Sequence, residues 1–146
     1  MKIEPCDVLA LEKTTNFIKN EKPDITCIQE AFAPKTKSLF NFQDQYEYID
    51  ELIEVGQFKY WFFSPSWGFE MGGSIVQVGN IILSKYLLSK TESLNVYGEY
   101  SIKKYNNNKR TNIRVLQTCQ AKLTEDKKLG LANYQGYLPG DDPIGN

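Results

Sequence analysis

The chain has 146 residues, of which 41% are hydrophobic and 24% are charged, and its net charge is -1. These values are typical of one globular domain over residues 1–146, and they exclude a global field that attracts nucleic acid or anionic membranes. The chain contains no histidine, which excludes catalytic relays, zinc sites and general bases that depend on imidazole.

The sequence also predicts a cellular location. It has no apolar run of 18 residues, and residues 1–20 lack the features of a secretory signal. We therefore expect a cytoplasmic protein without a membrane span. Cys6, Cys27 and Cys119 are odd in number and form no CxxC pair, so we interpret them as buried free thiols rather than as a disulfide framework or zinc site.

The first half of the chain predicts two helices and two strands. Helical spacing of apolar residues predicts a helix over 8–20, and the apolar run 25–28 predicts a buried central strand. The acidic face of a helix over 43–55 is interpreted as a solvated surface. The aromatic run 58–63 favours a strand packed in the core over a base-stacking platform.

The second half predicts mostly strands. Residues 64–79 are rich in glycine without clear periodicity, which predicts a functional or mobile loop before a buried strand over 80–84. Residues 106–108 predict a polar turn, and residues 136–146 an irregular tail. Odd positions of 113–123 are mostly apolar, which predicts a half-buried strand with an antiparallel neighbour over 129–134. The whole predicts an α/β or α+β layered fold.

The first candidate for a ligand or metal site is the pair Gln29 and Glu30, which follows the apolar run 25–28. Ligand and metal sites favour the carboxyl ends of buried strands. A lone carboxylate there can hold Mg²⁺, which typically binds one or two carboxylates together with water and substrate phosphate. The alternative is a capped or solvated glutamate.

Four segments carry a family resemblance. Residues 22–32, KPDITCIQEAF, resemble the metal-site strand of the endonuclease/exonuclease/phosphatase superfamily. Residues 79–85 (GNIILSK), 114–119 (RVLQTC) and 131–137 (LANYQGY) are similar to later strands of that family, in the family's order. The resemblance covers about 115 residues.

The resemblance implies a metal-dependent phosphoesterase with a four-layer α/β/β/α sandwich. This chain would be its amino-terminal half, with mixed or antiparallel sheets and helices on one outer face. Glu30 would be the metal ligand, for Mg²⁺ or Mn²⁺, and Arg114 would contact substrate phosphate. The alternative for Arg114 is a surface cation or a cross-strand ion pair.

A basic window also lies near Arg114. Residues 100–123 contain six basic and no acidic side chains, which suits either a phosphate-rich substrate or a solvated hairpin tip: Lys103, Lys104, Lys109, Arg110, Arg114 and Lys122.

The sequence departs from the family at the catalytic positions. The resemblance makes Asn133 and Gln135 the candidate catalytic residues. Asn133 matches the asparagine of the family's N-x-H-G motif, whereas Gln135 stands at its histidine, and an amide cannot relay a proton near neutral pH. The asparagine that ends the family's opening strand is missing, and Asp7 is its nearest polar substitute. The family's later Gly-Asp-x-Asn and Ser-Asp-His elements are absent from the sequence.

These departures leave three readings open. In the first, the chain is a truncated phosphoesterase that is weak or inactive by itself. The second reading is a non-catalytic binding or assembly module, and the third is an unrelated α+β domain. The second would pair an open inner sheet face with another copy or a complementing second half, through Ile113, Val115, Cys119, Ala121 and Leu123. The resemblance implies a phosphoester substrate without identifying its class, because relatives in this family act on nucleic acid, phosphoinositide and sphingolipid phosphoesters.

Overall fold

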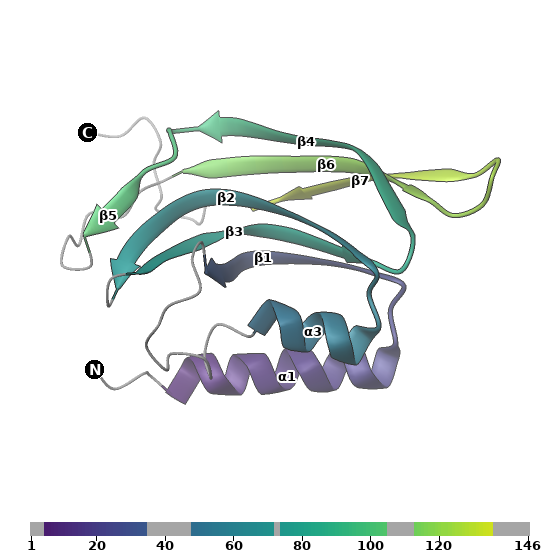
Figure 1. Cartoon of the computed structure of the whole chain (residues 1–146), viewed down its shortest axis with the longest axis horizontal. Helices are drawn as coiled ribbons and strands as arrows, with labels where there is room; N and C mark the ends of the chain where they lie inside the picture. The colour runs from purple at the N-terminus through teal and green to yellow at the C-terminus, as the bar shows by residue number, and fades with distance from the viewer. Residues whose placement is uncertain (1–4, 35–47, 72–73, 105–112, 136–146) are drawn as a thin grey trace.

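The computed structural model describes residues 5–34, 48–71, 74–104 and 113–135 (Figure 1). In these ranges the chain forms three layers: a pair of helices, a four-stranded sheet and a three-stranded sheet. The helices and strands are α1 (Pro5–Glu21), β1 (Ile25–Pro34), α3 (Tyr48–Gly56), β2 (Tyr60–Met71), β3 (Ser74–Ser84), β4 (Leu87–Tyr97), β5 (Ile102–Lys104), β6 (Arg114–Lys122) and β7 (Lys128–Tyr134).

Sheet A has the strand order β1-β3-β2-β5, and sheet B has the order β4-β6-β7. All pairings are antiparallel except the short parallel pairing of β5 with β2. Helices α1 and α3 cover the outer face of sheet A, and sheet B packs on its inner face. This confirms the predicted α+β class and the half-sandwich with helices on one outer face. No helix in the described ranges is long and apolar enough to cross a membrane.

The main apolar core lies between the helices and sheet A. Ile81 and Leu83 of β3 point to the helices and contact a cluster that includes Ile18 of α1 and Leu52 of α3, all at most 1% exposed. Because side chains alternate along a strand, Asn80 and Ile82 of β3 point the opposite way, to sheet B. β3 is therefore covered on both faces, which explains its nearly unbroken apolar run.

The inner face of β6 packs against sheet A within this chain. Val115, Cys119 and Ala121 are buried, and the exposed Leu123 follows the end of the strand. The predicted alternation is therefore confirmed, but this face is not open, because sheet A already covers it. The outer face of sheet B has no helix on it in the described ranges, and an apolar row of Leu94, Leu116 and Tyr134 crosses it.

Two strand predictions were wrong. Residues 64–79 do not form a loop, because most of them lie in the long β2–β3 hairpin, where Pro65 and Gly79 sit at a bulge that tolerates them. Among the described strands, β1 lies at the edge of sheet A, and β3 is the strand next to it in the interior. Burial by the helices on one face gives an edge strand the same apolar sequence as a central one.

Several other elements differ from expectation or lie beyond the described ranges. β4 was not predicted, because its exposed, polar sequence gives no alternating pattern. Cys119 is buried as expected, whereas Cys27 is exposed, and both are free thiols. The helix predicted over 43–55 is seen as α3 from Tyr48. Residues 43–47, the turn at 106–108 and the tail at 136–146 lie outside the described residues.

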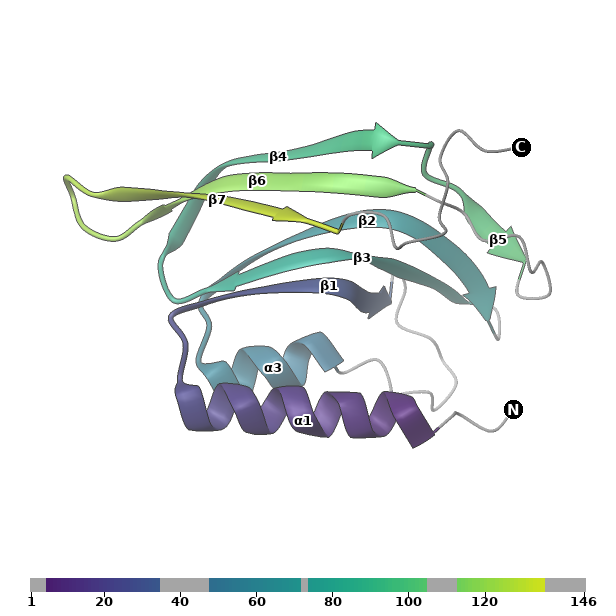
Figure 2. The same ribbon diagram turned by 180° about the vertical axis from the view of Figure 1, so that it is seen from behind.

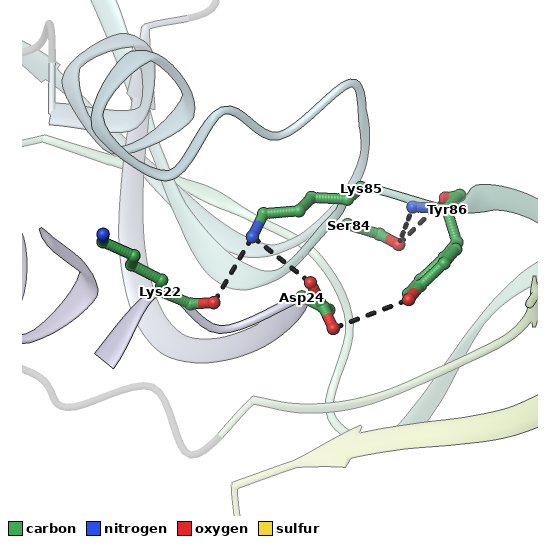
Figure 3. Close-up of polar contacts among 5 residues, drawn as sticks. All are labelled: Lys22, Asp24, Ser84, Lys85 and Tyr86. Atoms are coloured by element: carbon green, nitrogen blue, oxygen red, sulfur yellow. Dashed lines mark hydrogen bonds and ion pairs between the residues drawn. The ribbon is translucent and has the colours of Figure 1, made fainter. Parts of the chain in front are cut away.

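A polar cluster joins the start of β1 to the end of β3 (Figure 3). Lys85 Nζ lies 3.2 Å from Asp24 Oδ1 and donates to the carbonyl of Lys22 at 3.3 Å. Tyr86 OH donates to Asp24 Oδ2, and the Ser84 hydroxyl bonds both the N–H and the carbonyl of Tyr86. The Lys-Pro-Asp and Ser-Lys segments of the sequence therefore meet here as a structural clasp.

Candidate functional site

Glu30 lies at a bulge in the middle of β1, not at the carboxyl end of the strand. The register with β3 shifts between Ile28 and Ala31, and Glu30 has a left-handed backbone with φ 55°. That conformation costs a non-glycine residue roughly 1–2 kcal/mol. Bulges redirect side chains, and backbone strain of this kind gathers at functional sites. The bulge therefore marks Glu30 as a functional candidate independently of the sequence resemblance.

Gly79 of β3 lies between the register shifts of β1 and β2, where the backbones of β2 and β3 approach closely. It is the register partner of both Ala31 in β1 and Pro65 in β2, beside the register shifts of both strands. A Cβ atom at this position would collide with the backbone of Ser64 and Pro65. Only glycine allows the backbones to approach this closely.

The carboxyl end of β7 binds the bulge through three consecutive residues. Asn133 Nδ2 donates to the carbonyl of Ile28 at 3.1 Å. Gln29 Nε2 donates to the carbonyl of Tyr134 at 2.8 Å, and Gln135 Nε2 donates to Glu30 Oε1 at 2.9 Å. The structure thus brings Glu30, Gln135 and Asn133 together from two different sheets.

Asn133 also belongs to a cluster of buried amides between the sheets. Asn80, Gln117 and Asn133 are each at most 5% exposed. Asn133 Nδ2 lies 3.3 Å from Gln117 Oε1, and Asn80 Nδ2 donates to the carbonyls of Val115 and Asn133. Gln117 Nε2 donates to the carbonyls of Phe62 at 2.6 Å and Asn80 at 3.3 Å. We call Asn80, Gln117 and Asn133 the amide triad.

Asn80 and Gln117 were not among the site residues predicted from the sequence. The available signal was Gln117 itself, the polar residue at an odd position in a strand whose other odd positions are apolar. A polar side chain on the buried face of a strand requires hydrogen-bonding partners in the interior. Those partners belong to strands far away in the sequence, so the pattern alone did not reveal them.

Arg114 projects from a different face. It begins β6, and its neighbours Ile113 and Val115 are buried, so its side chain lies on the outward face of sheet B. Arg114 Nη1 donates to the carbonyl of Ile113 at 3.3 Å. Gln135, by contrast, reaches inward to Glu30. The side chains of Lys103 and Lys104, together with Lys109 and Arg110, lie outside the described part of the chain, and so does the side chain of Asp7.

Glu30 is the carboxylate available to a cation at the bulge. In the described ranges no three or more Cys, Asp or Glu side chains form a group able to hold a metal. One carboxylate with a neighbouring amide nevertheless fits Mg²⁺, which keeps several waters and takes further oxygens from substrate phosphate. Glu30 Oε1 accepts a hydrogen bond from Gln135, and the Glu30 side chain is exposed.

Neither described cysteine is an activated nucleophile. Partial desolvation by the surrounding protein raises the pKa of the Cys27 thiol, although the residue as a whole is exposed. Burial also raises the pKa of the Cys119 thiol, and the negative charge of a Cys27 thiolate nearby raises it further. A reactive thiolate needs a lowered pKa, so thiol chemistry at these two residues is not favoured.

Comparisons with solved structures identify the fold. An endonuclease/exonuclease/phosphatase family protein from Leptotrichia buccalis aligns with 97% of this chain at a TM-score of 0.62 and 15% identity. An endonuclease/exonuclease/phosphatase from Beutenbergia cavernae aligns with 89% of it at a TM-score of 0.61 and 14% identity. No family model matches the sequence, and no curated protein matches it significantly.

The match is to part of each neighbour. The chain spans 52% of the length of the Leptotrichia protein and 33% of that of the Beutenbergia protein. It therefore has the fold of a portion of an endonuclease/exonuclease/phosphatase protein, as the sequence motifs predicted.

Proposed function

We propose that this chain is the amino-terminal half of a metal-dependent phosphoesterase-like protein, in which Glu30 binds Mg²⁺ or Mn²⁺. The observation that carries the proposal is the bulge, because it holds Glu30 in a strained conformation beside Gln135. The shared fold of the two solved neighbours supports the same assignment. Two unpaired cysteines, Cys27 and Cys119, are compatible with the reducing cytoplasm, where we place the protein.

The residues around Glu30 have separate proposed roles. A bound cation supplies charge that polarises a phosphoryl oxygen. Gln135 orients the Glu30 carboxylate by its hydrogen bond and can instead donate to a substrate phosphate. Asn133 supports the same site by donating to the backbone carbonyl of Ile28. Arg114 binds a phosphate that reaches the outer face of sheet B.

We further propose that the chain alone hydrolyses phosphodiesters and phosphomonoesters weakly or not at all. It has no histidine, and the Gln135 amide cannot transfer a proton near neutral pH. Removal of one preorganised catalytic group typically lowers the rate by about a hundredfold to a thousandfold. Metal binding, rather than turnover, is therefore the property to measure.

The test is to measure Mn²⁺ binding by calorimetry for the wild-type chain and for Glu30→Gln. The amide keeps the size of the carboxylate and removes its charge, so we expect affinity to fall at least about tenfold, as for a lost charged ligand. Glu92→Gln is the matched control, because Glu92 is an exposed carboxylate at a bulge of β4. Equal affinity in the wild type and Glu30→Gln contradicts the proposed site.

A second candidate function is a non-catalytic assembly module. Within the part of the chain that the structure describes, β1 and β7 are edge strands. They lie on the same side of the molecule, where residues 28–30 bond residues 133–135 (Figure 2). Unpaired edges accept additional strands. The solved neighbours are longer than this chain, which favours a complementing second half or another copy at these edges. We expect an isolated chain to associate through them.

A further inference from the structure

The bulge of β1 places unusual demands on its surroundings. A bulge interrupts the ladder between neighbouring strands and leaves backbone groups without their regular partners. Buried backbone carbonyls require other donors. β1 is an edge strand, so in the described ranges only β3 supports it within sheet A.

Asn133 supplies a donor at that point. Its Nδ2 lies 3.1 Å from the carbonyl oxygen of Ile28 and 3.2 Å from that of Ile81. Ile28 and Ile81 are register partners in β1 and β3, immediately before the shift that contains Glu30. One side-chain amide from sheet B therefore binds both carbonyls of the last regular pair of sheet A before the bulge.

The orientation of the Asn133 amide is itself fixed. Gln117 Oε1 accepts from Asn133 Nδ2, while Gln117 Nε2 donates to the carbonyls of Phe62 and Asn80. The Asn133 backbone carbonyl accepts from Asn80 Nδ2. Because each member of the amide triad is buried and bonded to another, rotation of the Asn133 amide would leave several interior groups unpaired.

We propose that Asn133 is a positioning residue: it holds the β1 bulge from inside the sandwich and thereby presents Glu30 to its ligand. It acts through the backbone of Ile28 and does not itself contact the ligand. The consequence for cation binding rests on the proposed function of Glu30, whereas the consequence for the bulge does not.

The experiment compares Asn133→Ala with Asn80→Ala by amide hydrogen exchange and by Mn²⁺ binding. Asn80 is the matched control because it belongs to the same amide triad and is equally buried, yet its side chain bonds Val115 and Asn133 and not β1. We expect Asn133→Ala to accelerate exchange at residues 29–31 at least about tenfold more than Asn80→Ala does, after correction for the measured stability of each variant.

Mn²⁺ affinity should fall by about tenfold to a hundredfold in Asn133→Ala, as is typical for loss of a group that orients a metal ligand. Asn80→Ala should lower Mn²⁺ affinity less than Asn133→Ala does, because the Asn80 side chain bonds the Asn133 carbonyl and reaches β1 only through Asn133. Equal exchange at residues 29–31 in the two variants overturns the proposal. If the wild type binds no Mn²⁺, the proposed function fails, while the exchange comparison still decides the role of Asn133.

A milder variant guards against loss of folding. Asn133→Ser keeps one donor that is too short to reach both carbonyls, and it should show a smaller acceleration at the same residues. In the wild type, the side-chain NH₂ of Asn133 should exchange slowly with solvent by nuclear magnetic resonance. A rapidly exchanging Asn133 amide also overturns the proposal.

Discussion

Glu30 combines a functional side chain with a backbone conformation that most L-amino acids avoid. Lys90 has the same left-handed conformation, with φ 48°, at a bulge of β4 far from the candidate site. Glycine would adopt either conformation without a steric penalty. What distinguishes Glu30 from Lys90 is the hydrogen bond that its carboxylate accepts from Gln135 at the candidate site.

We predict that Glu30→Gly raises the free energy of unfolding by about 0.5–1 kcal/mol, because relief of strain exceeds the added entropy of the unfolded chain. The same variant should lose Mn²⁺ binding. Lys90→Gly is the control, since it should gain similar stability and keep Mn²⁺ binding. Urea unfolding measures the stability of both variants, and calorimetry measures their Mn²⁺ binding. A lower stability of Glu30→Gly would show that its carboxylate stabilises the fold instead.

At the scale of elements, the chain relies on a few polar connections at strand ends. The clasp of Asp24, Lys85 and Tyr86 ties the turn before β1 to the turn after β3 (Figure 3). Lys85 also bonds the carbonyl of Lys22, which has a left-handed backbone just after α1. These contacts fix where β1 begins and thus its register with β3.

We predict that Lys85→Met lowers the free energy of unfolding by up to about 1 kcal/mol, because it removes a half-exposed ion pair together with a bond to a backbone carbonyl. Lys122→Met is the control, since Lys122 pairs with a nearly fully exposed Glu125 within one turn. It should cost about half as much or less. The difference in unfolding free energy between the two variants should shrink in 1 M salt, where the Debye screening length is about 3 Å. Equal costs for the two variants would contradict a role for the clasp.

At the scale of the molecule, the two sheets are covered unequally. Sheet A is packed between the helices and sheet B, whereas sheet B has an uncovered outer face in the described ranges. β4, at one edge of sheet B, contains Lys90, Glu92 and two bulges, all features that protect an edge from pairing. β1 has one bulge and an exposed Phe32, so the side formed by β1 and β7 is the less protected.

We predict that the isolated chain associates in a concentration-dependent way and that Phe32→Lys reduces this association. A charge at an exposed position of an edge strand disfavours pairing with another strand. Leu94→Lys is the control, because Leu94 is an exposed apolar residue of β4 on the protected edge. Light scattering over a range of concentrations measures the effect. A chain that stays monomeric throughout contradicts the assembly function.

Much of the local structure followed from the sequence. Helical spacing predicted α1 and most of α3, and strict alternation predicted β6 with its antiparallel neighbour β7. These patterns report which face of an element is buried, which is a local property. The same patterns failed at the β2–β3 hairpin, where a bulge at Pro65 and Gly79 accommodates residues that otherwise indicate a loop.

The single domain expected over residues 1–146, the odd number of cysteines and the absence of histidine follow from the sequence. So does the choice of Glu30, Asn133 and Gln135 as candidates, because residue type limits the chemistry that a side chain can perform. Only the tertiary structure decided that these three side chains meet, that Arg114 lies on another face, and that Asn80 and Gln117 join Asn133. The physical reason is that hydrogen bonds between two sheets join residues up to 105 positions apart, and short-range patterns carry no record of such contacts.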